Sequence, residues 1–177
     1  MTAEAPHTSG ARLAFPELFG RYPATVCIVT TIDADGTPRG STCTAVTSLT
    51  ADPPTLLVSF MADSNTLRSV RSASSFAVNV MGRGGEQTMR ALASKAVDKF
   101  DAVDWVVPEE SVSGAPLFKR GVLAYADCTV HSETEIEDHV LVVGRIEGIH
   151  EGDASEALLY ADRRTWYLSA EPRTAAA

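Results

Sequence analysis

The hydrophobic pattern of the chain is dominated by short β-branched or alternating segments, which are typical of β-strands. Residues 121–132 alternate over the longest distance, with apolar side chains at the even positions from Val122 to Val130. This period of two predicts a long strand that is buried on one face, with Tyr125 and Asp127 on the polar side. The other expected strands are residues 25–32, 39–46, 55–60, 76–81, 139–149, 158–160 and 165–168.

Only three segments have helical spacing. Residues 15–22 form a short amphipathic pattern that ends at Pro23, residues 64–73 begin with Ser64 as a candidate N-cap, and residues 86–94 place Met89 and Leu92 on one side. Seven or eight strands with so few helices do not form a regular βα alternation. The fold class predicted is α+β, dominated by an antiparallel barrel, because closure removes the exposed sheet edges.

The length of 177 residues fits one domain of ordinary size. No internal repeat or linker divides the chain. We therefore predict a single domain over residues 13–169, with flexible tails at residues 1–12 and 170–177.

Composition excludes several partners. The formal net charge is −8, from 15 Lys and Arg against 23 Asp and Glu, which argues against nucleic-acid binding. No apolar run approaches the roughly 18 residues needed to span a membrane. The three cysteines, Cys27, Cys43 and Cys128, are scattered and form no CxxC motif. They indicate reduced, inert thiols and a cytoplasmic location.

Common catalytic motifs are missing. The glycine-rich residues 82–87 follow a strand, but the third position of a GxGxxG fingerprint falls on Gln87, so we interpret them as a turn. The chain has no P-loop and no GxSxG elbow. His131, His139 and the acidic residues between them leave two interpretations open, a divalent metal site or a solvated acidic hairpin, and we favour the hairpin.

Residues 40–54 are the most informative stretch, because six Ser and Thr residues fall within ten positions. A strand leading into a hydroxyl-rich loop can bind a phosphate through O–H and backbone N–H donors. A plain Thr-rich edge strand with its turn explains the pattern equally well. Ser64, Asn65 and Thr66 lie at an expected helix N-terminus, where anions also bind.

The chain resembles the flavin reductase-like family with the split β-barrel FMN-binding fold, the reductase components of two-component flavin-dependent monooxygenases. The resemblance covers residues 15–168. It rests on an ordered series of motifs: YPATVCIVTT at 22–31, GSTCT at 40–44, SLTADPP at 48–54, FAVNV at 76–80, DKF at 98–100, GAPL at 114–117, LAYADC at 123–128, DH at 138–139 and Tyr167. The chain has Glu137 where the family motif has glycine, and Thr44 where it has asparagine.

The resemblance implies an antiparallel split β-barrel with a few short flanking helices. It also implies an NAD(P)H:flavin oxidoreductase that reduces FMN or FAD with NADH or NADPH, forms a homodimer and supplies a partner monooxygenase. His139 would be the catalytic residue and would bind the nicotinamide together with Tyr167. The expected flavin-binding residues are Thr42, Cys43, Thr44, Ala45, Ser48, Leu49, Thr50, Ser59, Ser64, Asn65, Thr66, Lys95 and Lys99.

Two alternatives remain beside the reductase. The first is a flavoprotein of the same fold that keeps FMN as a fixed cofactor, such as an oxidase or an electron carrier. The second is a non-enzymatic module that binds flavin or haem. A flavin reductase needs no nucleophile and no metal, because the two cofactors carry the reaction, and this agrees with the missing catalytic motifs.

Overall fold

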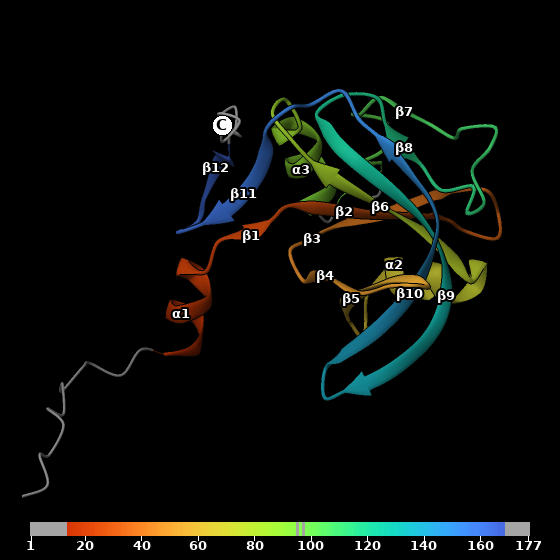
Figure 1. Cartoon of the computed structure of the whole chain (residues 1–177), viewed down its shortest axis with the longest axis horizontal. Helices are drawn as coiled ribbons and strands as arrows, with labels where there is room; N and C mark the ends of the chain where they lie inside the picture. Colours follow the sequence, from red (N-terminus) through yellow and green to blue (C-terminus); the bar gives the residue numbers. More distant parts are fainter. Residues whose placement is uncertain (1–13, 95, 97, 169–177) are drawn as a thin grey trace, which may run out of the picture.

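The computed structural model describes residues 14–94, 96 and 98–168 (Figure 1). Three helices flank the sheets: α1 (Phe15–Arg21), α2 (Asn65–Ala73) and α3 (Glu86–Ala93). The strands are β1 (Ala24–Thr25), β2 (Cys27–Ile32), β3 (Pro38–Cys43), β4 (Val46–Ala51), β5 (Pro54–Met61), β6 (Ser75–Met81), β7 (Trp105–Val106), β8 (Leu117–Phe118), β9 (Val122–Ile136), β10 (His139–Glu151), β11 (Ala157–Ala161) and β12 (Arg164–Leu168).

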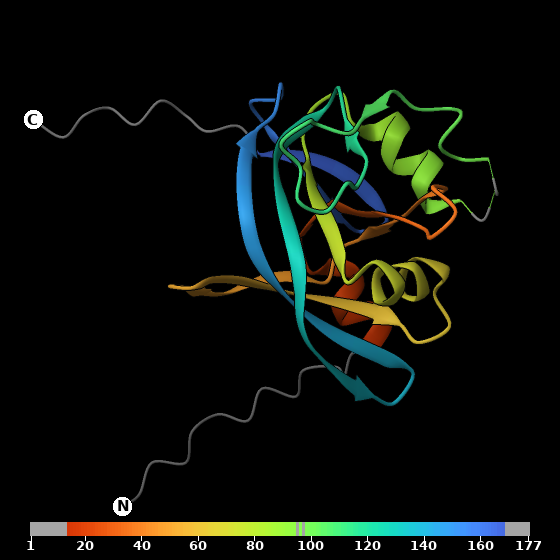
Figure 2. The ribbon, with the colours of Figure 1, turned by 90° about the vertical axis from the view of Figure 1, so that its right-hand side faces the viewer.

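The main sheet has seven antiparallel strands in the order β3-β2-β6-β9-β10-β5-β4. The long strands β9 and β10 bend the sheet strongly, with register shifts in their pairing after Val143 and Ile146 (Figure 2). Gly144 lies at the first shift, and a Cβ there would overlap the ring of Phe76. The bend therefore wraps the sheet around its own core, which agrees with the predicted antiparallel α+β class.

Strand β2 is buried on both faces, because it lies between two hydrophobic clusters. Cys27 and Val29 face a cluster that α2 closes with Leu67 and Val70, whereas Ile28 faces a second cluster that includes Leu92 of α3. A strand buried on both sides lacks polar alternation. This explains why residues 25–32 are continuously apolar or β-branched.

The three predicted helices are confirmed to within two residues at each end. The long strand predicted at residues 121–132 is also present and continues to Ile136. The prediction for Asp127 was wrong, because this residue is 3% exposed rather than on a polar face. Its carboxylate accepts hydrogen bonds from the Ser111 hydroxyl at 3.0 Å and the Val112 backbone N–H at 2.6 Å. A loop distant in sequence therefore covers and satisfies the carboxylate.

The hydroxyl-rich segment also differs from the prediction. Residues 46–51 form β4, an edge strand paired with β5, where we expected a loop after Val46, and Pro54 pairs with Ala51. Pro54 is the first residue of β5, a position at which a strand tolerates proline. Five of the six residues of β4 are exposed, so its hydroxyl groups follow the alternative of a Thr-rich edge strand.

The predicted tails, residues 1–12 and 170–177, lie outside the described residues. None of the helices in the described ranges combines the length and apolarity needed to cross a membrane. The acidic hairpin of β9 and β10 is paired with a cation: Arg71 Nε donates to Glu133 Oε2 at 2.8 Å and Arg71 Nη2 to Glu135 Oε1 at 3.5 Å. Among all the residues that the structure describes, no three His, Cys, Asp or Glu side chains are arranged to bind a metal ion.

Candidate functional site

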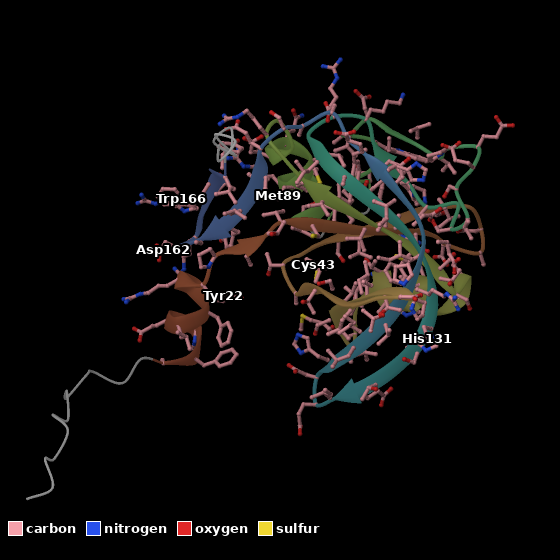
Figure 3. All side chains as sticks on the ribbon, in the orientation of Figure 1. Tyr22, Cys43, Met89, His131, Asp162 and Trp166 are labelled. Atoms are coloured by element: carbon pink, nitrogen blue, oxygen red, sulfur yellow. The ribbon has the colours of Figure 1, made fainter. Side chains whose placement is uncertain are left out.

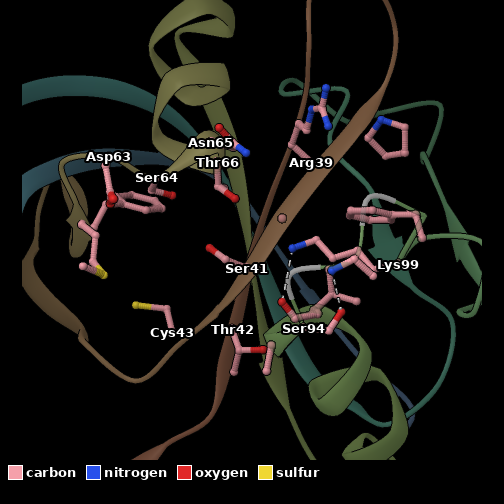
Figure 4. Close-up of a pocket in the computed structure, with 18 of the residues that line it drawn as sticks. Arg39, Ser41, Thr42, Cys43, Asp63, Ser64, Asn65, Thr66, Ser94 and Lys99 are labelled. Carbon is pink, nitrogen blue, oxygen red and sulfur yellow. Dashed lines mark hydrogen bonds between the residues drawn. The ribbon is translucent and has the colours of Figure 1, made fainter.

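A groove of about 820 Å³ lies between β3, the end of β5, the start of α2 and the end of α3 (Figure 4). Pockets of this volume hold ligands of cofactor size. Eight predicted site residues line it: Thr42, Cys43, Ser59, Ser64, Asn65, Thr66, Lys99 and His139. These residues come from five separate segments, which only the folded sheet brings together.

The start of α2 supplies backbone donors to the groove. Ser64 is the N-cap, and its Oγ accepts the Leu67 backbone N–H at 3.3 Å. Asn65 and Thr66 occupy the first turn, whose N–H groups have no acceptor within the helix. Both residues line the groove, so the positive end of the helix faces its interior. An anionic group is the natural ligand for this position.

Strand β3 forms the floor of the groove through Ser41, Thr42 and Cys43. Thr42 Oγ1 donates to the Met89 backbone carbonyl at 3.0 Å, which ties the floor to α3. Burial raises the pKa of the Cys43 thiol, and burial together with the neighbouring Cys43 raises the pKa of Cys27 to about 12. Both thiols are therefore protonated and inert at neutral pH, as the sequence indicated.

The two ends of the groove differ in character. Cys43 lies near one end, whereas Arg39 and Lys99 lie at the other (Figure 4). Phe60 and Met61 add apolar side chains to the lining, and the Cys43 thiol lies 3.6 Å from the carbonyl of Ser59, which precedes them on β5. Lys99 Nζ donates to the Leu92 carbonyl at 3.3 Å, and burial and the charge of Arg39 lower the pKa of its ammonium. A ligand with an apolar ring and a negatively charged tail matches this distribution.

His139 lies at the rim of the groove, at the first position of β10. It pairs in register with Met61 of β5, so the β9–β10 turn is held beside the end of β5. Its Nδ1 lies 2.7 Å from Asp138 Oδ1, and this hydrogen bond lowers the pKa of the Asp138 carboxyl. Asp138 therefore fixes the ring orientation while the Nε2 edge remains available.

Other predicted residues lie elsewhere. Thr44 and Ala45 connect β3 to β4, and Ser48, Leu49 and Thr50 lie on exposed β4; none of them lines the groove. Tyr167 lies on β12 with its ring 4.0 Å below the Arg83 guanidinium, also away from the groove. Lys95 lies outside the described residues. The roles expected for these residues therefore stay predictions.

Sequence reasoning missed several groove residues. Arg39, Ser41, Asp63 and Ser94 line the groove but were not in the expected set. Ser41 belongs to the hydroxyl-rich stretch, so its type was a usable signal. Arg39 gave no signal, because a single arginine near a turn is usually solvated.

The flavin reductase like domain model matches residues 19–169 of the chain. The chain belongs to this family. Among its relatives is the NADH flavin reductase of Kitasatospora aureofaciens, 36% identical over 165 residues, with 92% of this chain and 85% of the relative covered. The relative named flavin reductase (NADPH) from Lentzea aerocolonigenes is 37% identical over 147 residues, covering 82% of this chain and 84% of that protein.

Solved structures give the same family fold. The Streptomyces globisporus C-1027 NADH:FAD oxidoreductase SgcE6 matches with a TM-score of 0.81 and 32% identity, covering 92% of this chain and all of that one. That enzyme has also been solved in complex with NAD and FAD fragments. BorF, the reductase component of a bacterial two-component tryptophan halogenase, matches with a TM-score of 0.77 and 26% identity over 88% of this chain and 96% of that one. The flavin reductase fold predicted from the motifs is therefore confirmed.

Proposed function

We propose that this reductase transfers a hydride from NADH or NADPH to FMN or FAD. The observation that carries the proposal is the groove itself, which joins an apolar end, a helix N-terminus and a cationic end within one space. Relatives at 36% and 37% identity are named as NADH and NADPH flavin reductases, and they support the same reaction. The two cofactor rings supply the redox chemistry when bound, so the protein's task is to bind and orient them.

The groove residues suggest how the flavin is oriented. The first-turn N–H groups of Asn65 and Thr66 would bind its phosphate, supported by the hydroxyl group of Ser41. The ring system would then lie toward Cys43 and the end of β5, where Met61 lines the groove. This arrangement leaves the open side of the groove, next to His139, for the nicotinamide.

Anaerobic mixing tests the activity. The protein with excess FMN or FAD should bleach the flavin absorbance band on addition of NADH or NADPH. In steady-state assays, the rate should saturate with added free flavin, because the flavin acts as a co-substrate. A rate indifferent to added flavin would favour the fixed-cofactor flavoprotein, and a band that never bleaches would favour a binding module.

His139→Gln should raise the KM for the nicotinamide nucleotide roughly tenfold while the flavin Kd changes less than threefold. The expected loss is one hydrogen bond from a partly exposed group, about 1–1.5 kcal/mol. Initial rates at saturating flavin and fluorescence titration of flavin measure the two effects. His131→Gln is the matched control, since His131 is exposed on β9 and does not line the groove. A larger effect on the flavin Kd would instead assign His139 to the flavin.

We also propose a homodimer in which α1 contacts the second copy. Figure 3 shows α1, with Tyr22 following it, set apart from the main sheet. The apolar side chains of this segment are exposed, at 74% for Phe15, 52% for Leu18 and Phe19, and 62% for Tyr22. A seven-residue helix is unstable alone in water, so this apolar face needs a partner surface.

Light scattering after size exclusion should give twice the 18.8 kDa of one chain. The double variant Phe15→Ser with Phe19→Ser should shift the mass toward the monomer, whereas Thr37→Ser in the β2–β3 turn should not. A wild-type protein that elutes at the mass of one chain would refute the dimer.

The same proposal includes a partner protein and a location. Relatives include the reductase subunit HsaB of a flavin-dependent monooxygenase from Rhodococcus jostii, so we infer that reduced flavin leaves this groove for a monooxygenase. The three cysteines are free, which fits the reducing cytoplasm.

A further inference from the structure

The cationic end of the groove brings together two positive side chains from different elements. Arg39 lies on β3, and Lys99 lies in the segment that follows α3. Figure 4 shows both at the end of the groove away from Cys43. Of the described residues that line the groove, these two alone carry a fixed positive charge, in a chain whose net charge is −8. The local potential is therefore opposite to that of the whole chain.

Arg39 is held in a position suited to ligand binding. Its Nε donates to Asp33 Oδ2 at 3.2 Å, and its side chain is 32% exposed. Within the described ranges, the two Nη groups have no hydrogen-bond partner. A guanidinium fixed through Nε presents its outer donors as a planar fork, which matches the oxygen spacing of a phosphate.

Lys99 also lines the groove, and its ammonium group has donors left over for a ligand. Its Nζ makes one hydrogen bond, to the Leu92 carbonyl, and an ammonium group has three donors. The charge of Arg39 contributes to lowering the pKa of Lys99, so the fold keeps two like charges within interaction range. A bound anion would relieve this repulsion and gain two charged partners.

The groove therefore has two separate features that attract anions. The first-turn N–H groups of Asn65 and Thr66 are sufficient for one phosphate, and Arg39 with Lys99 forms another position farther from Cys43. FMN has a single phosphate, whereas FAD has a diphosphate that continues to an adenosine. Two anion-attracting positions in one groove match a diphosphate better than a single phosphate.

We propose that Arg39 is a specificity-determining residue, which with Lys99 binds the second phosphate of FAD and makes this reductase select FAD over FMN. The inference rests on the proposed flavin reductase function. The same chemistry would suit the 2′-phosphate of NADPH, and the experiment separates the two sources.

The experiment compares wild type, Arg39→Gln and Arg39→Lys in anaerobic fluorescence titrations with FAD and with FMN, and in initial-rate assays with NADH and with NADPH. We expect Arg39→Gln to weaken FAD binding roughly tenfold or more and FMN binding less than threefold. Arg39→Lys should fall between, because lysine keeps the charge but loses the fork. Arg68→Gln removes the same charge from the exposed face of α2, outside the groove, and should change neither affinity.

Melting temperatures confirm that each variant is folded before its affinity is compared. Equal losses of FAD and FMN affinity, or no loss of either, would overturn the role of Arg39. A higher KM for NADPH alone, with both flavin affinities unchanged, would assign the phosphate position to the nicotinamide nucleotide and also overturn the proposal. A wild-type protein that binds and reduces neither flavin would refute the reductase function itself, a result distinct from all of these.

Discussion

Gly121→Ala is expected to destabilise the fold strongly. Gly121 begins the turn into β9 with φ +68°, and a Cβ there would overlap the backbone N and Cα atoms of Gly85. Both obstacles are backbone atoms, so no side-chain rotation relieves the overlap. This close backbone contact between Gly121 and Gly85 also positions α3, because Gly85 is the N-cap of α3 and Gly82 N donates to the Gly121 carbonyl at 2.8 Å. We expect a loss of at least about 4 kcal/mol of unfolding free energy.

Thermal unfolding followed by circular dichroism measures this loss. Gly114→Ala is the matched control, since Gly114 has φ +64° but no atom within 4 Å of an added Cβ. It carries only the left-handed backbone penalty of about 1–2 kcal/mol, or roughly 2–8 °C in Tm for a domain of this size. If both variants lose the same unfolding free energy, the backbone near Gly121 and Gly85 moves apart at no energetic cost, which would contradict the prediction.

Asn65→Asp should weaken FMN and FAD binding while it stabilises the free protein. The new carboxylate would lie at the first position of α2, where the helix dipole favours negative charge by about 0.3–1 kcal/mol. The same carboxylate would repel a flavin phosphate bound at that helix end. At an effective dielectric constant of 20 and about 5 Å, repulsion between unit charges is about 3 kcal/mol, so we expect a Kd increase of roughly 100-fold or more.

Fluorescence titration and thermal unfolding on the same samples separate the two effects. Asn65→Ser is the neutral control, and its affinity should stay within about threefold of wild type. An Asn65→Asp protein that is stabilised yet binds flavin as tightly as wild type would place the phosphate away from α2. The opposite signs of the two effects distinguish a local charge effect from a general loss of structure.

Local chemistry made the secondary structure predictable. Ser64 as an N-cap, Pro23 after the first amphipathic turn and the alternation from Val122 to Val130 each depend on neighbours a few residues away. These signals placed the three helices and most of the strands. The same reasoning failed at Asp127 and at residues 46–51, where a distant loop and a neighbouring strand decide burial and pairing.

The sequence by itself therefore determined the antiparallel α+β class, the family and the residue types available to a phosphate. Only the tertiary structure decided that Ser64–Thr66 and Lys99 face the same groove, that Ser48 and Tyr167 do not, and that Arg39 joins them. The reason is that a groove is built from segments far apart in the chain, whose side chains meet only after β3, β5 and the two helices have packed. Local patterns specify how each segment folds, but long-range packing specifies which of its faces meets a ligand.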